Sequence, residues 1–203
     1  EQGHAVAQFS LVSCYGQGQG VEESLEEAMR YLQMAAQQGL SMAQTALGQF
    51  LRDGHGVGQS YEEAAHWFRL AAEQGDLDAQ YEMGCHYHAG KGTNQSYEEG
   101  ARWLRLAAEQ GHTGAQRNLG ICYYNGEGIK QSYDEALHYF LLATKKGDAR
   151  AQHYLGVCYY KGAGVEQSYE EAVRWHRLAA EQDDEDAQFN LGASYANGQG
   201  VEQ

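Results

Sequence analysis

The chain has 203 residues, a formal net charge of −14, 26 glycines and no proline. A protein that neutralises phosphates needs clustered Lys and Arg, so this charge argues against nucleic acid and anionic membrane surfaces as partners. The sequence has no apolar run near 18 residues and no basic-then-apolar leader, which argues against membrane insertion and against a targeting signal within this segment.

A constant period organises the sequence. The dipeptide Ala-Gln recurs six times, from Ala7 to Ala187, each copy 36 residues after the last. Self-similarity at this spacing is typical of solenoids, in which one supersecondary unit stacks on copies of itself. We predict an all-α solenoid domain over 1–203, with five repeats and a final first helix, and repeats that start near 4, 40, 76, 112, 148 and 184. We also expect the segment to belong to a longer array.

Each repeat predicts two helices, which we call helix A and helix B. In the third copy, Ala79, Met83 and Tyr87 recur at helical spacing, and a glycine-containing loop follows. Ser96 then begins Ser-Tyr-Glu-Glu, a capping box in which the hydroxyl accepts the N3 amide and the Glu side chain reaches back to the N-cap amide. Helix B is expected to end at Gly111, where glycine takes the left-handed conformation.

The same box recurs in the other repeats, at Ser24, Ser60, Ser132 and Ser168. Asp183 replaces the terminal glycine in the last complete copy, so this helix end is predicted to be the most strained.

The aromatic residues follow the period too. We call the residues at one position of successive repeats a column. All three tryptophans share one column of helix B with two tyrosines, and we expect these large residues to fill the core. The column contains Tyr31, Trp67, Trp103, Tyr139 and Trp175.

Four cysteines raise the question of disulfides. Cys14, Cys122 and Cys158 share a column and Cys85 lies one residue from it, so the nearest thiols are on equivalent helices of adjacent repeats. Packed helices lie about 8–10 Å apart, whereas a disulfide needs Cα atoms about 4.4–6.8 Å apart. We therefore expect buried thiols without disulfide bonds, which favours a reducing compartment. A signal sequence in a longer parent would instead direct the protein to the periplasm or to a host.

The repeat resembles a known family. Its pattern Ala-Gln-x-x-Leu-Gly-x-x-Tyr-x-x-Gly-x-Gly-Val-x-x-Ser-Tyr-Glu-Glu-Ala is similar to the Sel-one-like repeat, a relative of the tetratricopeptide repeat, over nearly the whole chain. Departures are local: Val12, Met83, Thr93 and Gly100 replace the usual residues. The resemblance implies a right-handed superhelix of antiparallel helix pairs that serves as a scaffold or adaptor for protein partners, with helix A lining the concave surface.

Three columns of helix A differ in residue type from copy to copy. They lie at i, i+4 and i+7 and so form one stripe on each helix, which we call the helix A stripe. Its aromatic, positive and titratable residues are of the kinds enriched at protein interfaces. We predict that the stripe binds a protein or peptide, with Tyr81, His88, Tyr124, His153 and Tyr160 as central anchors; the alternative is surface without constraint. The predicted partner-binding residues are Phe9, Arg52, Tyr81, Cys85, His88, Arg117, Ile121, Tyr124, His153, Val157, Tyr160 and Phe189.

Other clusters receive plainer interpretations. Helix B carries a basic stripe whose members follow an acid by one turn, as Arg102 follows Glu98, which is typical of a solvated, self-neutralised face. Cys85, His86 and His88 form only a partial metal shell, so we predict no metal site. No catalytic or dinucleotide-binding motif is present, so we predict neither enzyme activity nor a cofactor.

The basic stripe consists of Arg30, Arg102 and Arg174 with His66 and His138 in the same column, and of Arg69, Arg105 and Arg177 three residues further on. A second class of function remains open at this point, a structural spacer or a rod that self-associates end to end through uncapped terminal repeats.

Overall fold

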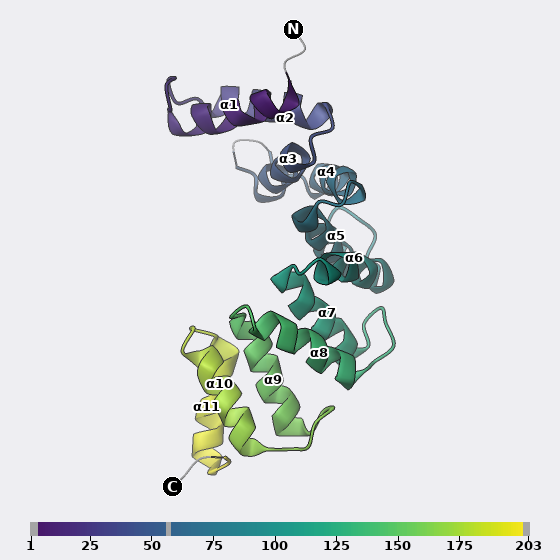
Figure 1. Cartoon of the computed structure of the whole chain (residues 1–203), viewed down its shortest axis with the longest axis vertical. Coiled ribbons are helices and arrows are strands. Elements are labelled where there is room, and N and C mark those ends of the chain that lie inside the picture. The colour runs from purple at the N-terminus through teal and green to yellow at the C-terminus, as the bar shows by residue number, and fades with distance from the viewer. Residues whose placement is uncertain (1–3, 56–57, 201–203) are drawn as a thin grey trace. The chain divides into compact units, whose positions relative to one another are not determined.

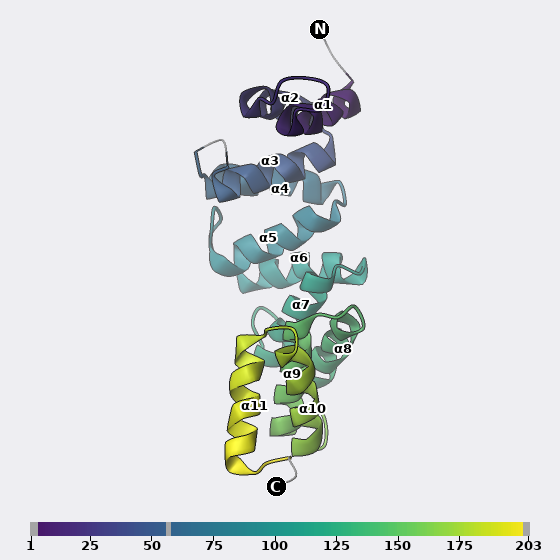
Figure 2. The same cartoon turned by 90° about the vertical axis from the view of Figure 1, so that its left-hand side faces the viewer.

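The computed structural model describes residues 4–55 and 58–200, and within these ranges it contains eleven α-helices and no strand. Helices A and B of each repeat alternate along the chain (Figures 1 and 2), as predicted. The A helices are α1 (Ala5–Gln17), α3 (Ser41–Asp53), α5 (Leu77–Ala89), α7 (Thr113–Asn125), α9 (Ala149–Lys161) and α11 (Glu185–Asn197). The B helices are α2 (Leu25–Gln37), α4 (Tyr61–Glu73), α6 (Tyr97–Glu109), α8 (Tyr133–Thr144) and α10 (Tyr169–Ala180).

The chain divides into two compact units, Glu1–Trp103 and Leu104–Gln203, with the boundary inside α6. In the first unit, α1 packs on α2 and α3 on α4, and α2 and α4 each contact the A helix that follows. The second unit repeats this arrangement with α7 on α8, α9 on α10, and α11 against α10. Both units are therefore built from helix pairs stacked in sequence order.

Serine begins each B helix, but only half of the predicted capping box is present. The Oγ of Ser60 accepts a hydrogen bond from the Glu63 amide at 3.2 Å, and the other four serines do the same. The serine amide itself donates to a carbonyl of the preceding A helix, as Ser60 N does to Leu51 O at 2.9 Å. The predicted bond from the glutamate is therefore wrong, because the amide it would satisfy is already paired.

The recurring Ala-Gln dipeptide has a structural explanation. Gln44 lies buried at the start of α3, and its Nε2 donates to the carbonyl of Ala36 in the preceding α2 at 3.1 Å. Its Oε1 accepts a hydrogen bond of 2.7 Å from Gln74, at the end of α4. One glutamine thus connects two neighbouring repeats, and Gln182 binds Gln152 in the same way in the second unit.

The largest core residues lie one position after the tryptophan column. These fully buried side chains are Leu32, Phe68, Leu104, Phe140 and His176. In the predicted column only Trp103 is buried, at 7% exposed, and the other four members are half-buried. The core prediction is therefore confirmed for Trp103, whereas Trp67 and Trp175 are partly buried and pack against the core, and the deepest position lies one residue later. The column instead flanks the tyrosines of helix A, as the stacked rings of Tyr123 and Tyr139 show.

Glycine in helix A makes room for this core. A Cβ on Gly120 would lie 2.6 Å from the Phe140 ring, and one on Gly156 would lie 2.6 Å from the His176 ring. At the end of α10, Asp183 has a φ of 63°, the one positive φ of a non-glycine residue in the described chain. This confirms the predicted left-handed helix end at that residue.

The four cysteines are thiols, as predicted. Cys122 and Cys158 are buried in the second unit, whereas Cys14 and Cys85 are half-buried in the first. Burial raises the pKa of Cys158 to about 12, so this thiol stays protonated near neutral pH.

Candidate functional site

In the first unit, the helix A stripe is held by contacts between neighbouring A helices. Arg52 of α3 pairs with Glu82 of α5, and its Nε also donates to the Oδ1 of Asp53 at 2.7 Å. The Arg52 guanidinium lowers the pKa of Asp53 below its ordinary value. His88 lies edge-on to Tyr97 of α6, with ring centroids 4.8 Å apart. The remaining stripe residues of this unit, Phe9, Tyr81 and Cys85, are half-buried.

In the second unit, the stripe is rich in ring contacts. Tyr124 of α7 contacts Tyr133 of α8 and Tyr154 of α9, with centroids 5.3 and 6.3 Å apart. Tyr160 contacts Tyr169 at 5.3 Å. Arg117 forms an ion pair of 2.8 Å with Asp148. The aromatic stripe residues are thus braced against neighbouring helices, which fixes their orientation.

Four further stripe residues of this unit differ in exposure. Phe189 on α11 is 76% exposed. Ile121 and Val157 are half-buried. His153 is only 8% exposed, so most of the surface of this expected anchor is covered by other side chains.

The surface is hollowed between two pairs of neighbouring A helices. One hollow, of about 610 Å³, lies between α3 and α5, and the other, of about 300 Å³, lies between α9 and α11. The two hollows occupy equivalent places in repeats that are three apart along the chain. Seven repeat positions contribute a lining residue to both hollows. The shared pairs are Arg52 and Tyr160, Asp53 and Lys161, Glu82 and Asn190, Cys85 and Ala193, His86 and Ser194, Ala89 and Asn197, and Lys91 and Gln199.

One column that lines both hollows holds a residue of different size between α7 and α9. It holds Glu82 at the α3–α5 hollow and Asn190 at the α9–α11 hollow, but Tyr154 between α7 and α9. The Tyr154 ring stacks on Phe140, with centroids 5.1 Å apart, and also contacts Tyr124. A large side chain in this column therefore occupies the space that Glu82 and Asn190 border elsewhere.

The α3–α5 hollow is charged. Arg52, Asp53, Glu82 and Lys91 line it, together with the buried His86. The His86 Nδ1 lies 2.7 Å from the Lys91 carbonyl oxygen, and because a carbonyl only accepts, Nδ1 carries the proton. Burial lowers the pKa of His86. The charge in this hollow therefore comes from the acids and bases and not from the imidazole.

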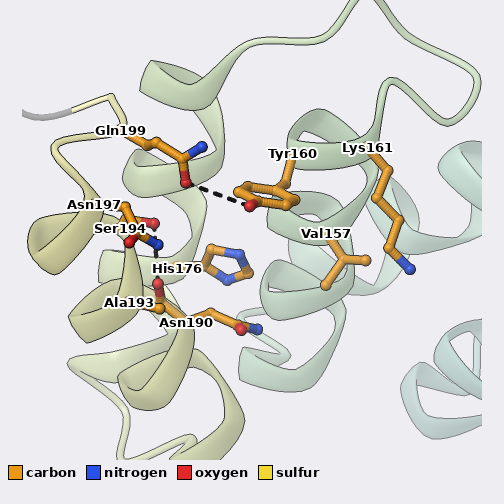
Figure 3. A pocket seen from close by; sticks show the side chains of 9 residues that line it. All are labelled: Val157, Tyr160, Lys161, His176, Asn190, Ala193, Ser194, Asn197 and Gln199. Carbon is orange, nitrogen blue, oxygen red and sulfur yellow. Dashed lines mark hydrogen bonds between the residues drawn. The ribbon is translucent and has the colours of Figure 1, made fainter.

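The α9–α11 hollow is mostly uncharged (Figure 3). The Tyr160 hydroxyl donates to Gln199 Oε1 at 3.3 Å, and the Ser194 hydroxyl donates to the Asn190 carbonyl at 2.9 Å. The His176 ring lies among these side chains, with 2% of its residue surface exposed and with no partner for Nδ1. Burial, followed by the neighbouring His153, lowers the pKa of His176 to about 4, so the imidazole is neutral near pH 7.

Sequence reasoning missed the most informative residues of these hollows. The column of Glu82, Tyr154 and Asn190 changes from copy to copy as much as the stripe does, and this variation was the available signal. His176 is the polar member of an otherwise apolar core column, a departure that is also visible in the sequence.

The arginines of the basic stripe on helix B have other partners than predicted. Arg30, Arg102 and Arg174 pair with the acid three residues earlier, not four, as in the 3.2 Å contact of Arg102 with Glu99. The second set of arginines donates to tyrosine hydroxyls of the next A helix. The pairs are Arg69 with Tyr87, Arg105 with Tyr123, and Arg177 with Tyr195.

Within the described residues, no cluster of three His, Cys, Asp or Glu side chains could hold a metal ion. None of the described helices combines the length and apolar character needed to cross a bilayer.

Stacked antiparallel helix pairs with a fixed 36-residue period define an α-helical repeat protein of the solenoid class. The Sel1 repeat model matches residues 5–40, 41–76, 77–112, 113–148, 149–184 and 185–203. The chain therefore belongs to the Sel1 repeat family, whose members are in general protein–protein interaction scaffolds and typically non-catalytic.

Solved structures with the same fold agree with this assignment. A protective antigen of uropathogenic Escherichia coli is 36% identical with a TM-score of 0.90, over 99% of this chain and 43% of that one. A Sel1 repeat protein from Oxalobacter formigenes is 35% identical with a TM-score of 0.89, over 99% and 80%. The chain thus spans less than half the length of the first of these relatives. A comparison with curated proteins gave no match.

A more distant similarity supports the fold alone. An immunity protein from Pseudomonas aeruginosa is 20% identical with a TM-score of 0.55, over 91% of this chain and 67% of that one.

Proposed function

We propose that the chain is a non-catalytic scaffold that binds an extended peptide segment of a protein partner along the helix A stripe. One observation carries this proposal: both units have a hollow between neighbouring A helices at equivalent positions, and stripe residues line both. Arg52 and Cys85 line the first hollow, and Val157 and Tyr160 line the second. The residues proposed to bind the partner are the twelve stripe residues named in the sequence analysis.

The orientation of the stripe side chains supports binding. Tyr124 and Tyr160 are each held by a second tyrosine, and Arg52 and Arg117 are each held by an ion pair. Side chains that are already ordered lose less conformational entropy on association, so they contribute more of their contact energy to affinity.

The test begins with peptides selected from a random display library on the purified protein. A selected peptide is then titrated against the double variant Tyr124→Ala plus Tyr160→Ala, and against a control pair on helix B, Arg102→Ala plus Arg174→Ala. We expect the tyrosine variant to weaken binding at least about tenfold, as buried aromatic anchors do, and the arginine variant to bind like wild type. Equal affinity of all three proteins, at equal helicity by circular dichroism, would contradict the proposal.

We also propose that both units belong to one solenoid domain, because the 36-residue period crosses the boundary in α6 without a slip. Repeat stability is approximately a sum of nearest-neighbour terms. We expect one urea transition, monitored in parallel by the fluorescence of Trp67, Trp103 and Trp175 and by helicity. Two separate transitions would contradict a single domain.

A second function, end-to-end self-association, is supported by a different feature. Tyr195 and Phe189 on α11 are 51% and 76% exposed, and a Cβ on Gly192 would meet nothing within 4 Å. Exposed apolar surface of this kind favours association. Sedimentation velocity should then show a mass that rises with concentration for wild type and not for Phe189→Ser. A monomer at all concentrations would exclude this function.

A further inference from the structure

His176 is out of place as a core residue. Its column is otherwise filled by Leu32, Phe68, Leu104 and Phe140, which pack without polar atoms. The imidazole brings two nitrogens into the same buried position, and Nδ1 has no hydrogen-bond partner there. An unpaired buried polar group lowers stability, so packing does not explain the residue.

Three of the nine residues that line the hollow beside His176 carry the same functional group. Asn190, Asn197 and Gln199 each carry a carboxamide, which both donates and accepts hydrogen bonds. Figure 3 shows the imidazole between Tyr160 of α9 and these side chains, of which Asn190 and Asn197 belong to α11 and Gln199 follows it. Lys161 is the single fully charged residue among the nine that line the hollow, and its Nζ lies 5.7 Å from the centre of the Tyr124 ring. No carboxylate is among the nine.

We propose that the α9–α11 hollow is a binding site for the uncharged carboxamide side chain of an asparagine or glutamine in a peptide partner. This proposal rests on the proposed function and names the residue type that one of its hollows selects. A carboxamide offers an N–H donor and a carbonyl acceptor, so it can pair with another carboxamide and with whichever His176 nitrogen needs a partner. The volume of about 300 Å³ is at the lower end of the range of ligand pockets and suits one side chain.

A cationic side chain fits this hollow less well, because no carboxylate lines it to neutralise the charge. An anionic side chain would find only Lys161, in a chain whose net charge is −14. The α3–α5 hollow provides the contrast, since Arg52, Glu82 and Lys91 line the equivalent places and favour a charged group. The two hollows therefore select different residue types from one partner.

The test uses three capped tripeptides, Ala-Gln-Ala, Ala-Glu-Ala and Ala-Leu-Ala, titrated into the isotopically labelled protein and followed by amide chemical shifts. We expect saturable chemical-shift changes in α9, α10 and α11 with the glutamine probe. Its dissociation constant should be at least fivefold lower than those of the other two peptides. The charged hollow between α3 and α5 should not show this preference.

Variants follow from the repeat itself. Asn190→Tyr introduces the residue that Tyr154 supplies between α7 and α9, and should abolish the glutamine shifts. His176→Phe introduces the side chain of Phe140 and keeps the fold. It should weaken binding of the glutamine probe at least fivefold. Asn125→Ala is the matched control for Asn197→Ala, because the two asparagines share a column and only Asn197 lines the hollow.

The outcomes separate the two proposals. Equal shifts with the leucine probe, a preference for the glutamate probe, or an unchanged response in Asn190→Tyr would overturn the carboxamide site. If the display selection still gives peptides that depend on Tyr124 and Tyr160, the scaffold function stands without it. If the selection gives no such peptide, while the glutamine probe binds as expected, the hollow is a carboxamide site and the extended groove is wrong.

Discussion

His153 of α9 and His176 of α10 lie against each other in the second unit, with ring centroids 5.2 Å apart and planes inclined by 46°. Neither Nδ1 has a hydrogen-bond partner, and the nearest acidic contact is Asp184 Oδ1, 3.9 Å from Nδ1 of His153. Asp184, which caps α11, and Asp186 in its first turn favour the protonated form of His153, whereas burial lowers the pKa of both imidazoles. The pair is therefore neutral in the folded protein near pH 7.

This pair predicts a loss of stability in mild acid. The folded pKa of His176 is about 4 against an ordinary 6.5, so between these values the unfolded chain binds more protons. Stability is fully present above about pH 6.5 and falls as the pH is lowered towards about 4, by up to about 3 kcal/mol from this residue. Urea unfolding at pH 7 and pH 4.5 measures the fall.

The control for this effect is His176→Phe, which removes the titrating group and retains the ring volume. We expect the variant to lose clearly less free energy of unfolding between the two pH values. The same loss in both proteins would show that His176 does not titrate as its burial requires.

Two glycines of one column should respond oppositely to alanine. Gly120→Ala places a Cβ 2.6 Å from the buried Phe140 ring, and we expect a destabilisation of about 1–3 kcal/mol from overpacking. Gly192→Ala meets nothing within 4 Å, so the higher helix propensity of alanine should stabilise α11 by up to about 1 kcal/mol. Urea denaturation of both variants tests this, and a similar effect of both would be inconsistent with the packing described.

At the end of α8, Thr144 and Lys146 differ from the residues that their columns hold in the other complete repeats. Thr144 replaces an alanine, and its Oγ1 is buried without a partner. Lys146 replaces a glutamine and binds the Gly111 carbonyl instead, which leaves Gln116 Oε1 without the bond that Gln152 receives from Gln182. We expect Thr144→Ala plus Lys146→Gln to stabilise the protein by about 1–2 kcal/mol, because two unsatisfied buried atoms are removed or paired.

Thermal unfolding is the measurement for this double variant. The matched control is Lys145→Gln, which changes an exposed lysine of the same segment and should leave the transition where it is. A lower transition temperature for the double variant would mean that Lys146 contributes more than the lost glutamine bond.

The backbone conformation of Asp183 predicts that a glycine at this position stabilises the protein. Its φ of 63° lies in the left-handed region that glycine occupies at the end of the other B helices, as at Gly147. Asp183→Gly should therefore stabilise the protein by up to about 1 kcal/mol, measured by urea unfolding. The reverse change, Gly147→Asp, should cost a comparable amount, and an opposite sign for either would contradict the strain at this position.

Local residues made most of the fold predictable. Ser60 and its equivalents mark where B helices begin, and glycines such as Gly111 mark where they end, since caps and left-handed turns depend on a few adjacent residues. The deepest core column lies one residue after the predicted one, at Phe68 and not at Trp67. Both positions face inward on a helix of 3.6 residues per turn, and only the packed neighbours decide which is deeper.

The candidate site was predictable only in part. The stripe led to Arg52, Cys85, Val157 and Tyr160, all of which line hollows, because variation between copies is visible in the sequence. Whether a hollow is open depends on residues from separate helices, such as Tyr154 against Phe140. Such contacts between helices cannot be read from a period.

The glutamine bonds have a consequence for how this protein changes over generations. Gln74 binds Gln44 within one repeat, whereas Gln44, Gln80 and Gln116 bind the carbonyls of Ala36, Ala72 and Ala108 in the repeat before, so each of these bonds reaches no further than the adjacent repeat. Gain or loss of a 36-residue segment by recombination would rejoin equivalent partners and leave the framework intact. The lining of a hollow would then be inherited as a cassette, and new binding specificities would arise by reordering existing units.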